Sequence, residues 1–271
     1  MEIVFDINFI KEVAKTIDVT YIKHKQFSDG TDSKVFLLND KYLIKSNSLE
    51  QLKAEVEFFN INTNEIFQQI IYIEPNYQYV VYQFIDGEVM KKVKNPKEVI
   101  KKLIEIVSNY KIYEHEKFGY LDDLKDTWED FLLDEVEYSK DNITSYIPNN
   151  SIVIEAINKL KNKKFNKKLL HGDFGTHNFI QTDEFVGVID PQSVIGDELY
   201  DLFFAIVSNT DLLNSLTIDE LINIVPNKED KNINILLIVL YSRISRCLKY
   251  HPQDINIYMK YYNNLIKKIE K

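Results

Sequence analysis

The chain has 271 residues, 45% of them hydrophobic, which is enough for one large domain or two modest ones with a real core. Its formal net charge of −9 excludes a general nucleic-acid binder, because such proteins need an excess of lysine and arginine. The single cysteine, Cys247, cannot form an internal disulfide, and no apolar run is long enough to cross a bilayer, so we expect a cytoplasmic protein without membrane partners.

The first third of the chain alternates or clusters apolar residues between turn signals, a pattern typical of short strands. Asn39-Asp40 predicts a hairpin turn, because both residue types tolerate turn geometry. One amphipathic helix is expected before these strands and another among them. We predict helices over 9–17 and 49–60, and strands over 21–27, 34–38, 41–45, 70–73 and 79–85.

From Pro96 onward, the apolar residues recur mostly with helical spacing. Four of the seven glycines fall between residues 172 and 196, which indicates tight backbone geometry in that segment. A chain reversal at Asp86-Gly87 divides the protein into a strand-rich lobe over 1–87 and a larger helical lobe over 88–271, which predicts a two-lobe α+β enzyme. In the second lobe we predict helices over 97–113, 124–139, 151–160, 199–208, 218–224, 233–249 and 255–269, and short strands over 169–170, 179–180 and 185–189.

The glycine-rich segment contains the residues that best fit a chemical reaction. Asp173 and Asn178 stand five residues apart in a loop, and Asp190 ends the following apolar strand. Phosphoryl transfer mainly requires positioning and charge neutralisation, and Asp173 suits the group that orients the acceptor hydroxyl and takes its proton. Asn178 and Asp190 suit the oxygen ligands of Mg²⁺. Each alone would be an ordinary turn residue, but their order in a strand–loop–strand context favours the catalytic interpretation.

The string His171-Gly-Asp173-x-x-x-x-Asn178, followed by an apolar strand and Asp190, resembles the aminoglycoside phosphotransferase family, which is related to protein kinases and includes choline and fructosamine kinases. The segment 196–202 resembles the Gly-Asp-x-x-Tyr-Asp-Leu pattern of that family. The resemblance implies a protein-kinase-like fold, with a small antiparallel-sheet N-terminal lobe and a larger helical C-terminal lobe. It also implies that Asp173 is the catalytic base, that Asn178 and Asp190 hold magnesium, and that His171, Asp197 and Asp201 are structural supports.

The same resemblance implies an ATP or GTP site in the first lobe. Lys45 ends a predicted strand and would hold the α- and β-phosphates, while Glu55 of the next helix would hold Lys45. Glu57 is the competing glutamate, although Glu55 fits the register better. The other predicted nucleotide-binding residues are those of a phosphate-covering loop, Ser28, Gly30 and Ser33, and those of an adenine-binding hinge, Gln83, Phe84 and Ile85.

The acceptor is specified less sharply. Gly172 stands where protein kinases have the arginine of His-Arg-Asp, and the chain has no room for a long activation loop, so a small acceptor is favoured over a peptide. Nine acids against two lysines lie between residues 122 and 141. We predict that this face contacts a polycationic acceptor such as an aminoglycoside through Asp126, Glu129 and Asp130.

Other interpretations remain open at this point. A solvated helix face would explain the same acidic residues. A kinase for choline, a sugar or a fructosamine-type amine is the alternative among enzymes, and a nucleotide-binding pseudokinase is the alternative outside them.

Overall fold

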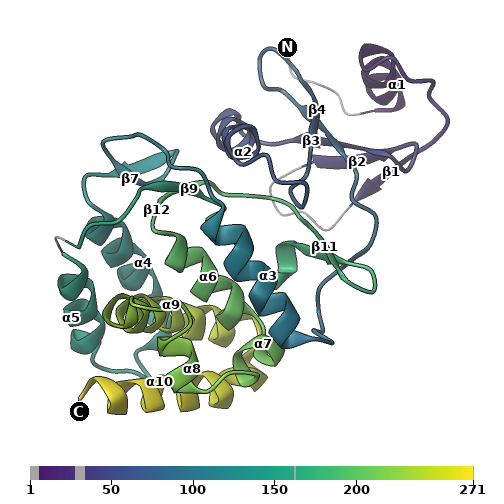
Figure 1. The fold of residues 1–271 in the computed structure, drawn as a ribbon. Coiled ribbons are helices and arrows are strands. Elements are labelled where there is room, and N and C mark those ends of the chain that lie inside the picture. The colour runs from purple at the N-terminus through teal and green to yellow at the C-terminus, as the bar shows by residue number, and fades with distance from the viewer. Residues whose placement is uncertain (1–5, 28–33, 162, 271) are drawn as a thin grey trace. The chain divides into compact units, whose positions relative to one another are not determined.

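The computed structural model describes residues 6–27, 34–161 and 163–270, which form two compact units. The first unit contains Met1–Val89 and Asn178–Gln192, and the second contains Met90–His177 and Ser193–Lys271. Figure 1 shows strands predominating in the first unit and helices in the second.

The first unit is built on an antiparallel sheet with the order β1-β2-β3-β5-β4. The hairpin between β2 and β3 turns at Asn39 and Asp40, both at φ +54°, which confirms the predicted turn. Asn39 reinforces it, because its Oδ1 accepts hydrogen bonds from the N–H groups of Ile22 and Lys23 at 2.9 and 3.2 Å. The strands are β1 (His24–Phe27), β2 (Lys34–Leu38), β3 (Tyr42–Ser46), β4 (Ile70–Ile73) and β5 (Val80–Gln83).

Two helices pack with this sheet. α1 (Ile7–Thr16) begins at Asp6, whose carboxylate accepts from the N–H groups of the first turn, and its apolar face joins Phe36 and Ile44 in one buried cluster. α2 (Leu49–Ile61) begins at Ser48 and contacts the sheet through the ring of Phe59, whose centroid lies 5.7 Å from that of Tyr82 in β5. The first unit therefore has a packed core, and this core keeps the end of β3 in a fixed position.

A smaller sheet in the first unit brings distant parts of the chain together. Its order is β11-β10-β6, with β6 (Glu88–Val89), β10 (Phe179–Gln181) and β11 (Phe185–Val188). Ile180 pairs with Val89, and Val188 forms a bridge with Phe67. The sequence-based division at residue 87 assigned 178–192 to the larger lobe; in the structure these long-range pairings join that segment to the first unit.

The second unit contains a short sheet and a group of helices around α9 (Glu229–Tyr250). The sheet has the order β8-β7-β12-β9, with β7 (Phe118–Tyr120), β8 (Asp123–Lys125), β9 (Lys168–Leu170) and β12 (Val194–Gly196). α9 contacts α4, α5, α6, α8 and α10, and it is surrounded by them in Figure 1. The other helices are α3 (Pro96–Ser108), α4 (Trp128–Ile143), α5 (Ser151–Leu160), α6 (Glu198–Ser208), α7 (Thr210–Asn214), α8 (Ile218–Ile222) and α10 (Ile255–Ile269).

Every predicted helix is present, and four of their ends are displaced by four or five residues, including the end of α4 at Ile143 and the start of α9 at Glu229. The helix predicted over 124–139 begins at Trp128, because Thr127 caps it and residues 123–125 pair with β7 instead. The helix predicted over 97–113 ends at Ser108. The strands β6, β7, β8 and β12 were not predicted. Within the described residues, none of the helices is both long and apolar enough to span a bilayer.

Candidate active site

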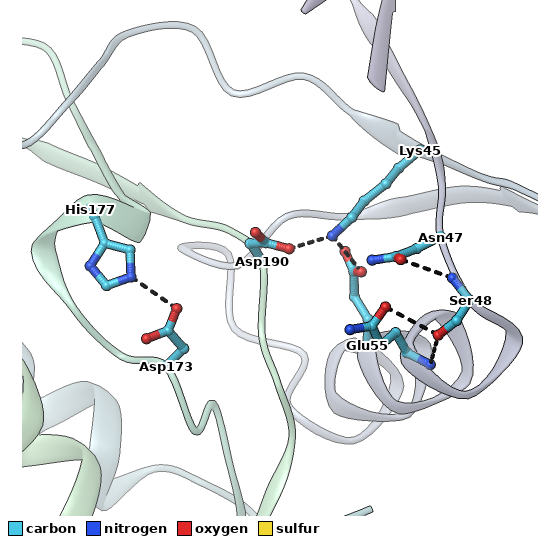
Figure 2. Close-up of polar contacts among 8 residues, drawn as sticks. Lys45, Asn47, Ser48, Glu55, Asp173, His177 and Asp190 are labelled. Atoms are coloured by element: carbon cyan, nitrogen blue, oxygen red, sulfur yellow. Dashed lines mark hydrogen bonds and ion pairs between the residues drawn. The ribbon is translucent and has the colours of Figure 1, made fainter. Parts of the chain in front are cut away.

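Lys45 is the centre of a charged group in the first unit. Its Nζ lies 2.7 Å from Oε2 of Glu55 and also contacts Oδ1 of Asp190, and Figure 2 shows the side chain extending between the two carboxylates. The side chains of Lys45 and Glu55 are almost fully buried, at 7% and 3% exposed, whereas Asp190 is 57% exposed. One ammonium group is therefore shared between a buried carboxylate and an accessible one.

Local structure explains why these groups meet. Lys45 lies in β3 between Val35 of β2 and Val80 of β5, in the middle of the sheet. Oγ of Ser48 accepts from the N–H of Gln51 at 3.3 Å and starts α2, so that Glu55 falls on its buried face. It is Glu55, and not the competing Glu57, that forms the ion pair with Lys45.

The charge on Lys45 is favoured by its surroundings. Burial alone would favour the neutral amine, but the carboxylates of Glu55 and Asp190 outweigh it and raise the pKa of Lys45 above its ordinary value. Lys45 is thus a permanent cation with little access to water, which makes it suitable for binding a negatively charged group.

Asp190 and Asn178 occupy adjacent strand ends. The N–H of Ile189 donates to the backbone oxygen of Asn178 at 3.0 Å, next to the Phe179–Val188 pair of β10 and β11. Asp190 follows in the left-handed region at φ +63°, which directs its carboxylate out of the strand. Aspartate tolerates this conformation better than most residues, which agrees with a constrained functional position.

These two side chains supply oxygen donors of the kind that Mg²⁺ prefers. The described residues contain no group of three or more His, Cys, Asp or Glu able to hold a metal ion. Magnesium does not require such a group, because it commonly binds one or two carboxylates together with substrate phosphates and water. Asp190 is exposed and Asn178 is buried at 5% exposure, so the accessible donor is Asp190, which suits magnesium delivered with a nucleotide better than a permanently caged metal.

In the second unit, hydrogen bonds to the side chain of Asp201 hold the loop that carries Asp173. The two carboxylate oxygens of Asp201 accept from the backbone N–H groups of His171 at 2.8 Å and Gly172 at 3.1 Å, and from Tyr110 Oη at 2.9 Å. Gly172 has φ +81°, a conformation that glycine adopts without strain. Burial raises the pKa of Asp201 to about 7, although its hydrogen bonds oppose this shift.

The other two predicted supports also make contacts in this unit. Asp197 caps α6, because its Oδ1 accepts from the N–H of Leu199 at 3.0 Å, and it forms an ion pair with Lys231. His171 is fully buried, and its backbone oxygen accepts from the N–H of Ser193 at 3.1 Å. The His171 bond joins the loop to the segment before β12, whereas the Asp197 contacts join the end of β12 to α6 and α9.

Asp173 pairs with a residue that the sequence did not single out. Nε2 of His177 lies 2.9 Å from Oδ2 of Asp173, and the two side chains face each other in Figure 2. Burial would favour the neutral acid, but the hydrogen bond and charge of His177, helped by His171 and Arg246, lower the pKa of Asp173 to about 2. The i, i+4 spacing of Asp173 and His177 was the available signal for this pair.

The remaining predicted nucleotide-binding residues are those of the phosphate-covering loop and those of the hinge. Ser28, Gly30 and Ser33 lie outside the described residues. At the predicted hinge, the N–H groups of Gln83 and Phe84 already donate to the backbone oxygens of Gln69 and Lys41, both at 2.8 Å. These two N–H groups are therefore used in backbone hydrogen bonds within the first unit.

The predicted acceptor residues lie at or just before the start of α4. Asp130 forms a capping box with Thr127, and Asp126 lies 3.3 Å from Nζ of Lys117. Glu129 is half-buried in the first turn. The capping box gives Asp130 a structural role of its own.

The fold and these two groups of side chains define a protein-kinase-like phosphotransferase. Residues 23–223 match the model of the phosphotransferase enzyme family (APH), which spans most of the sequence. The chain belongs to this family, and it is a phosphotransferase with a hydroxyl acceptor.

Solved structures of aminoglycoside phosphotransferases share the fold. APH(2'')-Ib bound to ADP is 17% identical with a TM-score of 0.58, covering 96% of this chain and 97% of that one. APH(4)-Ia is 14% identical with a TM-score of 0.63, covering 95% and 97%. The streptomycin–ATP complex of APH(2'')-IIa is 18% identical with a TM-score of 0.54, covering 98% and 97%. At these identities the similarity establishes the fold alone, and no curated protein matches the chain significantly.

Proposed function

We propose that this protein is a magnesium-dependent kinase that transfers the γ-phosphate of ATP or GTP to a hydroxyl group of an aminoglycoside, and thereby acts as a cytoplasmic antibiotic-resistance enzyme. The observation that carries the proposal is the buried Lys45 ammonium held between Glu55 and Asp190. Because Asp190 is largely exposed, it can exchange its contact with Lys45 for a metal ion while Lys45 turns to a phosphate.

In this proposal, each group has one task. Lys45 binds the α- and β-phosphates, and Glu55 keeps its ammonium in place. Asn178 and Asp190 would hold magnesium, which supplies neutralisation of the phosphate charge when it is bound. The acceptor oxygen forms a bond to the γ-phosphorus, the bond from the γ-phosphorus to the β–γ bridging oxygen breaks, and the hydroxyl proton passes to Asp173.

We assign the hydrogen bond to the adenine or guanine base to one backbone donor of the predicted hinge. Since the N–H groups of Gln83 and Phe84 are used within the first unit, Ile85 is left to donate from its backbone to the base. The predicted loop residues Ser28, Gly30 and Ser33 would supply N–H and hydroxyl donors to the phosphates.

Two observations support an aminoglycoside as acceptor. The residues of α4 and the turn before it are strongly acidic, which suits a polycation, with Asp126, Glu129 and Asp130 as the proposed contacts. Structural neighbours with the same fold were solved with hygromycin B, kanamycin and streptomycin. Lys45 and Asp173 would serve any hydroxyl acceptor, so the acceptor must be tested separately from the chemistry.

The test is a phosphorylation screen with magnesium and either ATP or GTP. The acceptors are kanamycin, hygromycin B, streptomycin, choline, a simple sugar and a glycated amine. We expect phosphate transfer to at least one aminoglycoside and a loss of at least about 100-fold in rate for Asp173→Asn. The exposed residue Asp230 of α9, whose side chain is 90% exposed, provides a matched control, because Asp230→Asn removes an acidic group outside the proposed site.

The outcomes separate the alternatives. Transfer only to choline, the sugar or the glycated amine would refute the aminoglycoside acceptor and keep the kinase chemistry. Nucleotide binding without transfer to any acceptor, equal in wild type and Asp173→Asn, would identify a nucleotide-binding module instead.

A further inference from the structure

The contact between His177 and Asp173 has a defined donor and acceptor. An ionised carboxylate only accepts hydrogen bonds, so the hydrogen between Nε2 of His177 and Oδ2 of Asp173 belongs to the imidazole. The low pKa of Asp173 agrees with this assignment. In the neutral ring, the hydrogen bond therefore selects the tautomer protonated at Nε2.

The loop is shaped to hold the His177 ring in this place. Gly175 lies beside the ring, and a Cβ at that position would come within 2.6 Å of Cε1 and 2.7 Å of Nδ1 of His177. The N–H of Gly175 donates to the backbone oxygen of Asp173 at 2.8 Å, and the N–H of Thr176 donates to Oγ of Ser208 at 2.9 Å. The turn that carries His177 is thus tied both to Asp173 and to α6.

The exposure of the two side chains is unequal. His177 is 54% exposed, whereas Asp173 is only 23% exposed. Truncation of His177 therefore removes little buried apolar surface, and its main consequence is the loss of a hydrogen bond to Asp173. A carboxylate has about four acceptor sites, so one bond from His177 is compatible with another from an acceptor hydroxyl.

We propose that His177 is a positioning residue, which fixes the orientation of the Asp173 carboxylate so that it can accept a hydrogen bond from the acceptor hydroxyl. This role rests on the proposed function of Asp173. His177 does not touch the substrate in this scheme; it acts through Asp173. The hydrogen bond limits rotation of the carboxylate, and a misplacement of about 1 Å in a catalytic group can cost on the order of 100-fold in rate.

Steady-state kinetics of three variants test this role with the acceptor found by the screen. His177→Ala should lower kcat by about 10- to 100-fold with little change in the KM for the nucleotide. His177→Gln keeps an N–H donor of similar reach and should recover most of that loss. The exposed His251 gives the matched control, because His251→Ala removes an imidazole elsewhere in the second unit.

Two kinetic results would overturn the proposal. One is a kcat for His177→Ala within about twofold of wild type, well short of the loss expected from misplacing a catalytic group. The other is an equal loss in His177→Ala and His177→Gln when both have the wild-type melting temperature. In an Asp173→Asn background, His177→Ala should reduce the residual rate much less than it does in wild type, because the group that it positions is gone.

A second measurement does not depend on activity. Nitrogen-15 NMR of the labelled protein reports which nitrogen of the His177 ring carries the hydrogen. We expect the Nε2–H tautomer for His177, and the Nδ1–H tautomer would overturn the inference even if no acceptor had been found. Failure of the proposed function would appear instead as absent phosphate transfer by wild type.

Discussion

Replacement of Lys45 by methionine should destabilise the protein strongly, because it leaves Glu55 charged and without its partner in a buried position. The Lys45–Glu55 pair joins two side chains that are 7% and 3% exposed at 2.7 Å. Removing one member of a buried pair costs about 3–5 kcal/mol. Asp190 loses the same partner, but at 57% exposure its carboxylate is hydrated and adds little to this cost.

The magnitude can be measured by urea unfolding and by a double-mutant cycle. Lys45→Met should lower the free energy of unfolding by about 3–5 kcal/mol and the melting temperature by roughly 10 °C. Lys45→Met combined with Glu55→Leu should recover much of this loss, since no unpaired charge then remains buried. The exposed Lys23–Asp40 pair, at 60% exposure for both side chains, is the matched control, and Lys23→Met should cost less than about 1 kcal/mol.

A coupling free energy near zero between Lys45 and Glu55 would refute this reasoning, as would equal costs for Lys45→Met and Lys23→Met. A smaller cost for Lys45→Met at acidic pH is consistent with it, because protonation of Glu55 then removes the buried charge.

Two further predictions concern the second unit. Because the folded pKa of Asp201 is raised to about 7 from 3.8, its contribution to stability is fully present below pH 3.8 and is lost as the pH rises through about 7. Between about pH 5 and 8, the stability of Asp201→Asn relative to wild type should therefore increase by about 2–3 kcal/mol in urea titrations. Gly196→Ala should cost about 1–3 kcal/mol, because its Cβ would overlap the ring of Trp128, which is packed against Phe131. Trp128→Phe should recover part of that loss in thermal melts, and a neutral Gly196→Ala would contradict the packing argument.

The sequence predicted the parts of the fold that local patterns determine. The hairpin at Asn39-Asp40 and the capped start of α2 follow from residues within a few positions of each other. The strands β7, β8 and β12 are only three residues long, too short for an alternating pattern. β7 and β12 form because they pair with each other across a long stretch of chain, and β8 then adds to β7 as the other strand of a short hairpin. Leu124 was therefore assigned to a helix although it pairs with Gly119.

The residues of the candidate site likewise divide into those that the local sequence predicts and those whose role depends on the folded chain. Lys45, Glu55 and Asp190 could be selected because each stands at a strand or helix position with a chemical requirement, and they do lie in contact. His177 was missed because its i, i+4 spacing from Asp173 lies in a loop rather than in a predicted helix, and the two side chains meet only through the folded turn around Gly175. The placement of 178–192 was missed because it depends on the pairing of Ile180 with Val89, ninety-one positions apart.

Because the first unit is made of two separate segments of the chain, it cannot be expressed as one continuous fragment. A fragment ending at Val89 would lack β10 and β11, so β6 would lose its partner strand and Asp190 would be absent. Truncation therefore cannot yield the first unit. An isolated version would need residues 178–192 joined to the earlier part by an artificial linker, and a library of insertions should tolerate breaks poorly at both junctions of that segment.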